Sequence, residues 1–196
     1  MNKAVFLDRD GVINEKAPTE DEYVTTWEEM KILPGVAQGI SLLNRAGFRV
    51  IVVSNQRSVA KGLITIADLE SIHQQMCDEL ARAGATIDDV YYCPHELEPP
   101  CACRKPEPGM LLEAALAHDI DLTGSWMIGD SDKDVEAGMK AGCRTARVLR
   151  NNETRNGSAD IVARSLFDAA QQILSAEGLF EEMASDPHEP ESYRTL

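Results

Sequence analysis

Short apolar runs rich in β-branched residues alternate along the chain with longer stretches of helical periodicity. Residues 50–53, Val-Ile-Val-Val, show no polar alternation, which is typical of a parallel strand covered on both faces. The clearest helical stretch, residues 66–83, carries one apolar stripe and begins at a capping box formed by Thr65 and Asp68. This alternation predicts an α/β fold with a doubly wound parallel sheet and helices on both faces.

The predicted strands cover residues 4–7, 49–53, 90–92, 125–128 and 145–149, with a weaker one at 160–162. The predicted helices cover residues 35–46, 66–83, 109–118, 132–141 and 165–176. We expect one domain over residues 1–176, without a separate cap domain, followed by an acidic flexible tail over residues 177–196. Parallel sheets bind ligands at the carboxyl ends of their strands, so polar residues that follow a strand are the first candidates for a site.

The charge balance of the chain excludes some partners. A formal net charge of −14 argues against a nucleic-acid partner, which is bound through clustered Lys and Arg. No apolar run approaches the ~18 residues that span a bilayer, and the apolar start at residues 4–7 is too short for a signal peptide. We therefore expect a cytoplasmic monomer with no nucleic-acid or membrane partner, and local cations must bind any anionic substrate.

Asp8 and Asp10 leave the first predicted strand as a pair, and the following Gly11 permits a sharp backbone turn. Taken alone, Asp-x-Asp-Gly is equally typical of a plain turn. Its place at the end of a buried strand favours a functional site, because desolvated carboxylates need a cation or another partner. A calcium loop requires glycine at position six, whereas Gly11 falls at position four counted from Asp8.

Three further polar clusters occupy similar places. Asp130 ends a predicted strand, whereas Asp132 and Asp134 are explained by the helix N-terminus that follows, which favours acidic side chains. The run Ser54-Asn55-Gln56 follows the second strand, and Arg104-Lys105-Pro106 precedes a helix. Each of these runs, taken alone, is a weak signal for function.

Taken in order, the four clusters resemble the four motifs of the haloacid dehalogenase (HAD) superfamily of phosphatases, over about residues 4–150. The resemblance implies a Rossmann-like core in which Asp8 is the nucleophile and forms an aspartyl-phosphate intermediate. It implies that Asp10 protonates the leaving alkoxide and then deprotonates water, for which Asp10 needs a raised pKa.

The resemblance also implies a Mg²⁺ ion held by Asp8, the main-chain carbonyl of Asp10, and Asp130. A cation is needed because two unit negative charges ~4 Å apart repel by about 4 kcal/mol at an effective dielectric constant of 20. Ser54 and Lys105 would stabilise the oxygens of the phosphoryl group in transfer.

Other roles are implied around this centre. Asp134 would orient Lys105 or a metal-bound water. Substrate contacts are expected from Asn55, Gln56, Arg57 and Arg104.

A cysteine-rich loop stands just before the lysine motif, with Cys93 and His95 followed after five residues by Cys101 and Cys103. Three thiols and one imidazole match the composition of a structural Cys₃His zinc site. The spacing is unusual for zinc, and a strained redox loop or incidental thiols are the alternatives. A Pro-rich loop without a hydrophobic core needs a cross-link to hold its shape, which favours zinc. Four protein ligands leave no open coordination position, so the zinc would be structural.

Within the superfamily, the loop is similar to a branch acting on a heptose bisphosphate or on histidinol phosphate. Residues 91–95 and 60–62 are similar to the heptose members, whereas the five-residue gap between His95 and Cys101 is more similar to the histidinol members. Ser131 stands where a lysine is common in the heptose members.

The resemblance favours removal of the 7-phosphate of D-glycero-D-manno-heptose 1,7-bisphosphate, a small sugar phosphate. Histidinol phosphate or another small phosphate ester is the alternative substrate. A zinc-stabilised binding module whose acids are structural is the non-enzymatic alternative, and it would release no phosphate.

Overall fold

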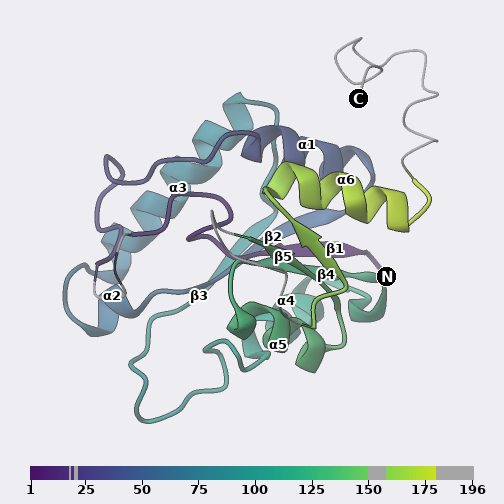
Figure 1. The fold of residues 1–196 in the computed structure, drawn as a ribbon. Coiled ribbons are helices and arrows are strands. Elements are labelled where there is room, and N and C mark those ends of the chain that lie inside the picture. Colours follow the sequence, from purple (N-terminus) through teal and green to yellow (C-terminus); the bar gives the residue numbers. More distant parts are fainter. Residues whose placement is uncertain (18, 20–21, 150–157, 180–196) are drawn as a thin grey trace.

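A central sheet lies between two layers of helices in the computed structural model, which describes residues 1–17, 19, 22–149 and 158–179 (Figure 1). Six parallel strands pair in the order β3-β2-β1-β4-β5-β6. They are β1 (Ala4–Leu7), β2 (Arg49–Asn55), β3 (Asp89–Cys93), β4 (Trp126–Gly129), β5 (Arg144–Val148) and β6 (Ile161–Ala163). The strand order reverses between β1 and β4, which is where sheets of this kind bind ligands.

The helices cover both faces of the sheet, as predicted. One layer holds α1 (Val36–Arg45), α3 (Ile66–Arg82) and α6 (Leu166–Ala176), and the other holds α4 (Gly109–His118) and α5 (Asp132–Ala141). In β2, Val50 and Val52 pack into the core of the first layer, whereas Ile51 and Val53 pack into that of the second. The unbroken apolar run therefore reflects burial on both sides, and the predicted doubly wound parallel sheet is confirmed.

Every predicted strand and helix is present, with its ends displaced by at most two residues. The displacement of two residues is at the end of β2, which continues through Ser54 and Asn55 because both residues pair with β3. Two short elements were not predicted, α2 (Arg57–Ala60) and the 3₁₀ helix η1 (Leu122–Gly124). One helical turn is too short to show periodicity in a sequence.

The residue after α6 is fixed to the body of the domain. The carboxylate of Glu177 lies 2.9 Å from Lys3 Nζ and 3.1 Å from Arg144 Nη1, and it accepts a hydrogen bond of 3.2 Å from the indole of Trp126. Residues 180–196 of the predicted tail lie outside the described residues. Within the described segments, no helix has the length and apolar character needed to cross a membrane. The cytoplasmic location and the monomeric state stay predictions.

Candidate active site

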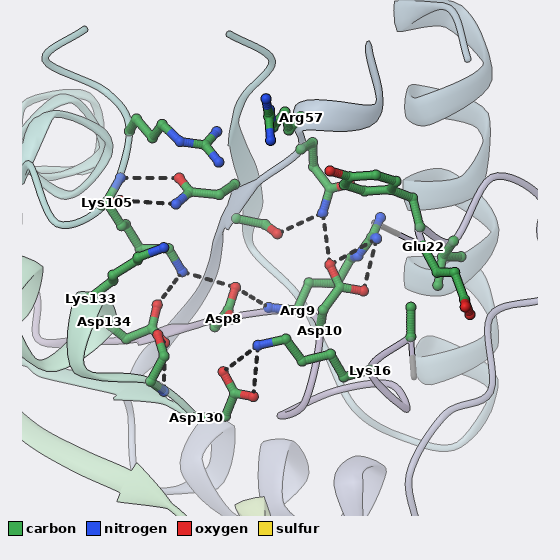
Figure 2. A pocket seen from close by; sticks show the side chains of 18 of the residues that line it. Asp8, Arg9, Asp10, Lys16, Glu22, Arg57, Lys105, Asp130, Lys133 and Asp134 are labelled. Carbon is green, nitrogen blue, oxygen red and sulfur yellow. Dashed lines mark hydrogen bonds and ion pairs between the residues drawn. The ribbon is translucent and has the colours of Figure 1, made fainter. Parts of the chain in front are cut away.

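A pocket of about 550 Å³ opens at the carboxyl ends of β1, β2 and β4 (Figure 2). The segment between β1 and α1 contributes Lys16, Glu22 and Tyr23 to its wall. The pocket also brings together the residues that the sequence assigned to phosphate chemistry and substrate binding: Asp8, Asp10, Ser54, Asn55, Gln56, Arg57, Arg104, Lys105 and Asp130.

Lys105 is a buried cation of the pocket, and its side chain is 2% exposed. Its Nζ lies 2.9 Å from Asp8 Oδ1 and 2.6 Å from Asp134 Oδ1, and it donates a hydrogen bond of 2.8 Å to the carbonyl of Val53. Three acceptors thus match the three protons of the ammonium group. Burial opposes the charge, but the two carboxylates outweigh it and raise the pKa of Lys105 above its ordinary value.

Asp8 lies at the end of β1, beside Lys105, and is 8% exposed. Its Oδ1 also accepts a hydrogen bond of 2.8 Å from the main-chain N–H of Arg9. Burial raises the pKa of Asp8 to about 7, against the opposing charge of Lys105 and with further repulsion from Asp134 and Asp130. A divalent cation in this corner would favour the ionised carboxylate that a nucleophile requires.

The carboxylate of Asp10 accepts hydrogen bonds from three neighbouring side chains. Arg9 Nη2 lies 2.9 Å from both carboxylate oxygens of Asp10, and the amides of Asn14 and Gln56 donate to them at 2.9 and 3.0 Å. Burial would raise the pKa of Asp10, but the Arg9 charge and these hydrogen bonds hold it below its ordinary value. The expectation of a raised pKa is therefore wrong for this conformation, because no sequence pattern indicates that the Arg9 side chain turns inward.

Two side-chain amides at the end of β2, those of Asn55 and Gln56, hydrogen-bond to other residues of the site. The Gln56 side chain donates to Ser54 Oγ at 2.8 Å as well as to Asp10. The Asn55 side chain exchanges two hydrogen bonds of 3.0 Å with the main chain of Lys105. Both amides thus hold the candidate catalytic residues in place from within the protein.

The pocket rim carries two further guanidinium groups. Arg57 forms an ion pair with Glu96, with 2.6 Å between Nη2 and Oε2. Arg104 donates a hydrogen bond of 3.2 Å to the carbonyl of His95. Both contacts come from adjacent residues of the cysteine-rich loop, which therefore positions both cations.

Sequence reasoning missed four cations that line the pocket: Arg9, Lys16, Lys133 and Arg147. Arg147 is the second-last residue of β5 and pairs with Gly129 at the end of β4. The rule that ligands gather at strand ends would have found Arg147, whereas no sequence signal singles out Lys16.

The carboxylates of the pocket fit a divalent cation. Oxygen atoms of Asp8, Asp130 and Asp134 lie within 4.8 Å of one another, and all three residues are buried. Hard oxygen donors of this kind suit Mg²⁺. Gly11 has φ 97°, and a Cβ atom there would overlap the carboxylate of Asp130, so the turn after β1 requires glycine. Both oxygens of Asp134 are engaged, Oδ1 by Lys105 and Oδ2 by the N–H and hydroxyl of Ser131. Lys105 and the N–H of Arg9 both contact Oδ1 of Asp8, which makes Asp8 the better carboxylate ligand of the two.

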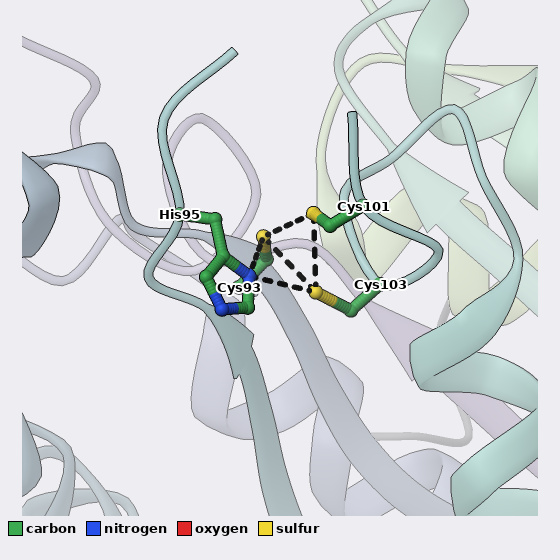
Figure 3. A group of neighbouring side chains, drawn as sticks. All are labelled: Cys93, His95, Cys101 and Cys103. Atoms are coloured by element: carbon green, nitrogen blue, oxygen red, sulfur yellow. Dashed lines mark hydrogen bonds between the residues drawn. The ribbon is translucent and has the colours of Figure 1, made fainter. Parts of the chain in front are cut away.

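The cysteine-rich loop forms a second cluster, in which Cys93, His95, Cys101 and Cys103 converge (Figure 3). The three sulfurs lie 3.3 to 3.5 Å apart, and His95 Nδ1 lies 3.2 Å from the sulfur of Cys103. All the cysteines are free. In a tetrahedral site with Zn–S distances near 2.3 Å, neighbouring sulfurs lie about 3.8 Å apart, so this cluster is close to the size that zinc requires.

Comparisons with known proteins show which family the chain is similar to. Residues 102–171 match the family described as HAD-hydrolase-like. The chain is 46% identical over 146 residues to a D-glycero-β-D-manno-heptose-1,7-bisphosphate 7-phosphatase of Rhodopseudomonas palustris, covering 71% of this chain and 79% of the relative. It is 36% identical over 181 residues to the enzyme of the same name from Escherichia coli K12, covering 87% of this chain and 93% of the relative.

A solved structure extends the likeness to three dimensions. The D,D-heptose 1,7-bisphosphate phosphatase of B. bronchiseptica, complexed with magnesium and phosphate, superposes with a TM-score of 0.81 at 36% identity. The match covers 89% of this chain and 99% of that one. With relatives this similar over most of their length, the chain belongs to the D-glycero-β-D-manno-heptose-1,7-bisphosphate 7-phosphatases, a family of phosphoric monoester hydrolases with the HAD-like fold.

Proposed function

We propose that this chain removes the 7-phosphate of D-glycero-β-D-manno-heptose 1,7-bisphosphate through an aspartyl-phosphate at Asp8. The observation that carries the proposal is the buried pairing of Asp8 with Lys105, 2.9 Å apart and beside Asp130, in a pocket of sugar-phosphate size. The curated relatives described above are named for this reaction. The non-enzymatic binding module has no comparable support.

In the first half of the reaction, a carboxylate oxygen of Asp8 bonds to phosphorus as the bond to the sugar oxygen breaks. The charge of Lys105 and a hydrogen bond from the Ser54 hydroxyl stabilise the transferring oxygens. Asp10 gives its proton to the leaving alkoxide. Mg²⁺, held by Asp8, Asp130 and the main-chain carbonyl of Asp10, would offset the repulsion between the phosphate and the nucleophile.

Asp10 must change protonation state between the two halves. The contacts from Arg9 keep Asp10 ionised before substrate binds. An anionic phosphate entering beside Asp10 raises its pKa, which allows the carboxyl group to carry the proton for the leaving alkoxide. Once ionised again, Asp10 accepts a proton from the water that attacks the phosphorus of the aspartyl-phosphate.

A bisphosphate offers a second anion that can orient the reacting end. Arg104 hydrogen-bonds a neutral carbonyl and keeps its full charge, whereas Glu96 balances the charge of Arg57. We therefore assign the 1-phosphate to Arg104 rather than to Arg57. Because Ser131 stands in the place of a lysine, the contribution of this guanidinium to binding that phosphate matters more.

A structural zinc ion is part of the proposal. Cys93, His95, Cys101 and Cys103 would hold it, since the four donor atoms already converge. The loop runs directly from Cys103 into Arg104 and Lys105, so zinc would fix the position of both cations. All four ligands come from the protein, which leaves no open coordination position for catalysis.

The test compares kcat/KM for heptose 1,7-bisphosphate and histidinol phosphate at saturating Mg²⁺. We expect the bisphosphate to be preferred by more than tenfold, a difference of about 1.4 kcal/mol in transition-state binding. A tenfold preference for histidinol phosphate would overturn the assignment. Arg104→Ala should reduce kcat/KM for the bisphosphate more than for an aryl phosphate, and equal losses would show that Arg104 does not read the 1-phosphate.

A further inference from the structure

Lys16 places a positive charge on a carboxylate that the sequence assigned to Mg²⁺. Its Nζ lies 3.2 Å from Oδ2 and 3.4 Å from Oδ1 of Asp130, so both oxygens of that carboxylate face one ammonium group (Figure 2). The Asp130 side chain is fully buried, whereas the Lys16 side chain is 40% exposed. The Lys16 side chain thus extends from the pocket wall to Asp130 and remains partly exposed to solvent.

The charges of this corner explain why Lys16 enters it. Asp8, Asp130 and Asp134 crowd their oxygens within 4.8 Å, and buried carboxylates without counter-charges are strongly destabilising. Lys105 lies against Asp8 and Asp134 but accounts for only one positive charge. Lys16 supplies a second positive charge at the carboxylate that Lys105 does not pair with.

A metal ion and the ammonium group compete for the same oxygens. Magnesium binds carboxylate oxygens directly and demands close, octahedral contacts. A cation on either oxygen of Asp130 would meet the like charge of Lys16 Nζ at close range. The ammonium group can leave without disturbing the core, because Lys16 lies in the segment between β1 and α1 and is partly exposed.

We propose that Lys16 is an exchangeable counter-ion for the metal site. It neutralises Asp130 in the metal-free protein, it is displaced when Mg²⁺ binds, and the contact that must break lowers the Mg²⁺ affinity. Lys16 thereby keeps the metal-free corner stable. The proposal rests on the magnesium site described above, but it needs no assumption about the sugar substrate.

The experiment titrates MgCl₂ into metal-free protein by isothermal calorimetry, without substrate. Lys16→Met should bind Mg²⁺ about tenfold more tightly than the wild type, because no ion pair has to break. Lys31→Met is the matched control, since Lys31 lies in the same segment, is 70% exposed and pairs with Glu15 at 3.9 Å. It removes the same charge and should change the affinity by less than about twofold.

Thermal unfolding gives a second readout. Metal-free Lys16→Met should unfold at a lower temperature than metal-free Lys31→Met, and saturating Mg²⁺ should remove that difference. If metal-free Lys16→Met does not fold, Lys16→Gln takes its place, because an amide can donate to Asp130 without a charge. An Mg²⁺ affinity in the folded Lys16 variant equal to or weaker than that of the wild type would overturn the proposal, even with catalysis unchanged.

Discussion

Replacing His73 with glutamine should make the fold less sensitive to mild acid. His73 lies on α3, is 4% exposed, and has its Nε2 3.3 Å from Nη1 of Arg9. The ring of Tyr92 packs against it, with 5.6 Å between centroids. Burial lowers the pKa of His73 to about 3, with a further lowering by Arg9 that the charge of Asp10 only partly opposes. The imidazole is therefore neutral and accepts a hydrogen bond from the guanidinium.

The magnitude follows from the difference between the two states of the chain. The pKa of His73 is about 3 in the folded protein and about 6.5 in the unfolded chain, so the unfolded chain takes up the proton first as the pH falls. The stabilising contribution is fully present above pH ~6.5 and is lost progressively toward pH ~3. At pH ~5.5 the loss amounts to about 1.4 kcal/mol, or roughly 3–6 °C in Tm for a domain of this size.

The assay compares urea unfolding of the wild type and His73→Gln at pH ~7.5 and ~5.5, with saturating Mg²⁺ in every sample. A glutamine amide can accept from Arg9 and does not titrate, and all the carboxylates titrate alike in both proteins. The wild type should lose about 1.4 kcal/mol more than the variant between the two pH values. An equal loss in both proteins would refute the reasoning, since His73 would then be protonated in the folded state as well.

Three further substitutions test other parts of the site. Elemental analysis should find about one zinc ion per chain in the wild type and less in Cys101→Ser, which should also have a lower Tm and lower activity. A variant that is metal-free but fully stable and active would contradict the zinc assignment. Glu96→Gln should free the charge of Arg57 and lower KM for the bisphosphate by about threefold, with no change in KM for an aryl phosphate. An unchanged KM for the bisphosphate would show that Glu96 does not limit substrate binding by Arg57. Gly11→Ala should destabilise the fold by about 1–3 kcal/mol and weaken Mg²⁺ binding through displacement of Asp130, whereas wild-type stability would show that the turn tolerates a side chain.

Much of the fold could be predicted because its signals are local. The capping box of α3 reflects contacts within one helix, and the apolar run of β2 reflects burial of one strand on both faces. Both appear where expected. The rule on strand ends then places Asp8 and Asp130 together, because β1 and β4 are neighbours in the sheet. Periodicity and topology were therefore enough to predict that these two carboxylates lie close together.

The electrostatics of the site could not be predicted in the same way. The sequence around Arg9 is typical of an exposed turn, yet Arg9 is 1% exposed and its guanidinium hydrogen-bonds to Asp10. There it contacts His73, which lies sixty-four positions away in the sequence. Lys16 similarly meets Asp130 only because the chain folds over the strand ends. Contacts of this range leave no periodic signal in a single sequence.

The central claim, that Asp8 is the nucleophile of a Mg²⁺-dependent phosphatase, is tested most directly by Asp8→Asn. Phosphate release from heptose 1,7-bisphosphate is measured at saturating substrate and Mg²⁺, and thermal unfolding confirms that the variant is folded. An amide cannot form the aspartyl-phosphate, so the account predicts that release is abolished. A folded variant that retains a tenth of the wild-type turnover would contradict it.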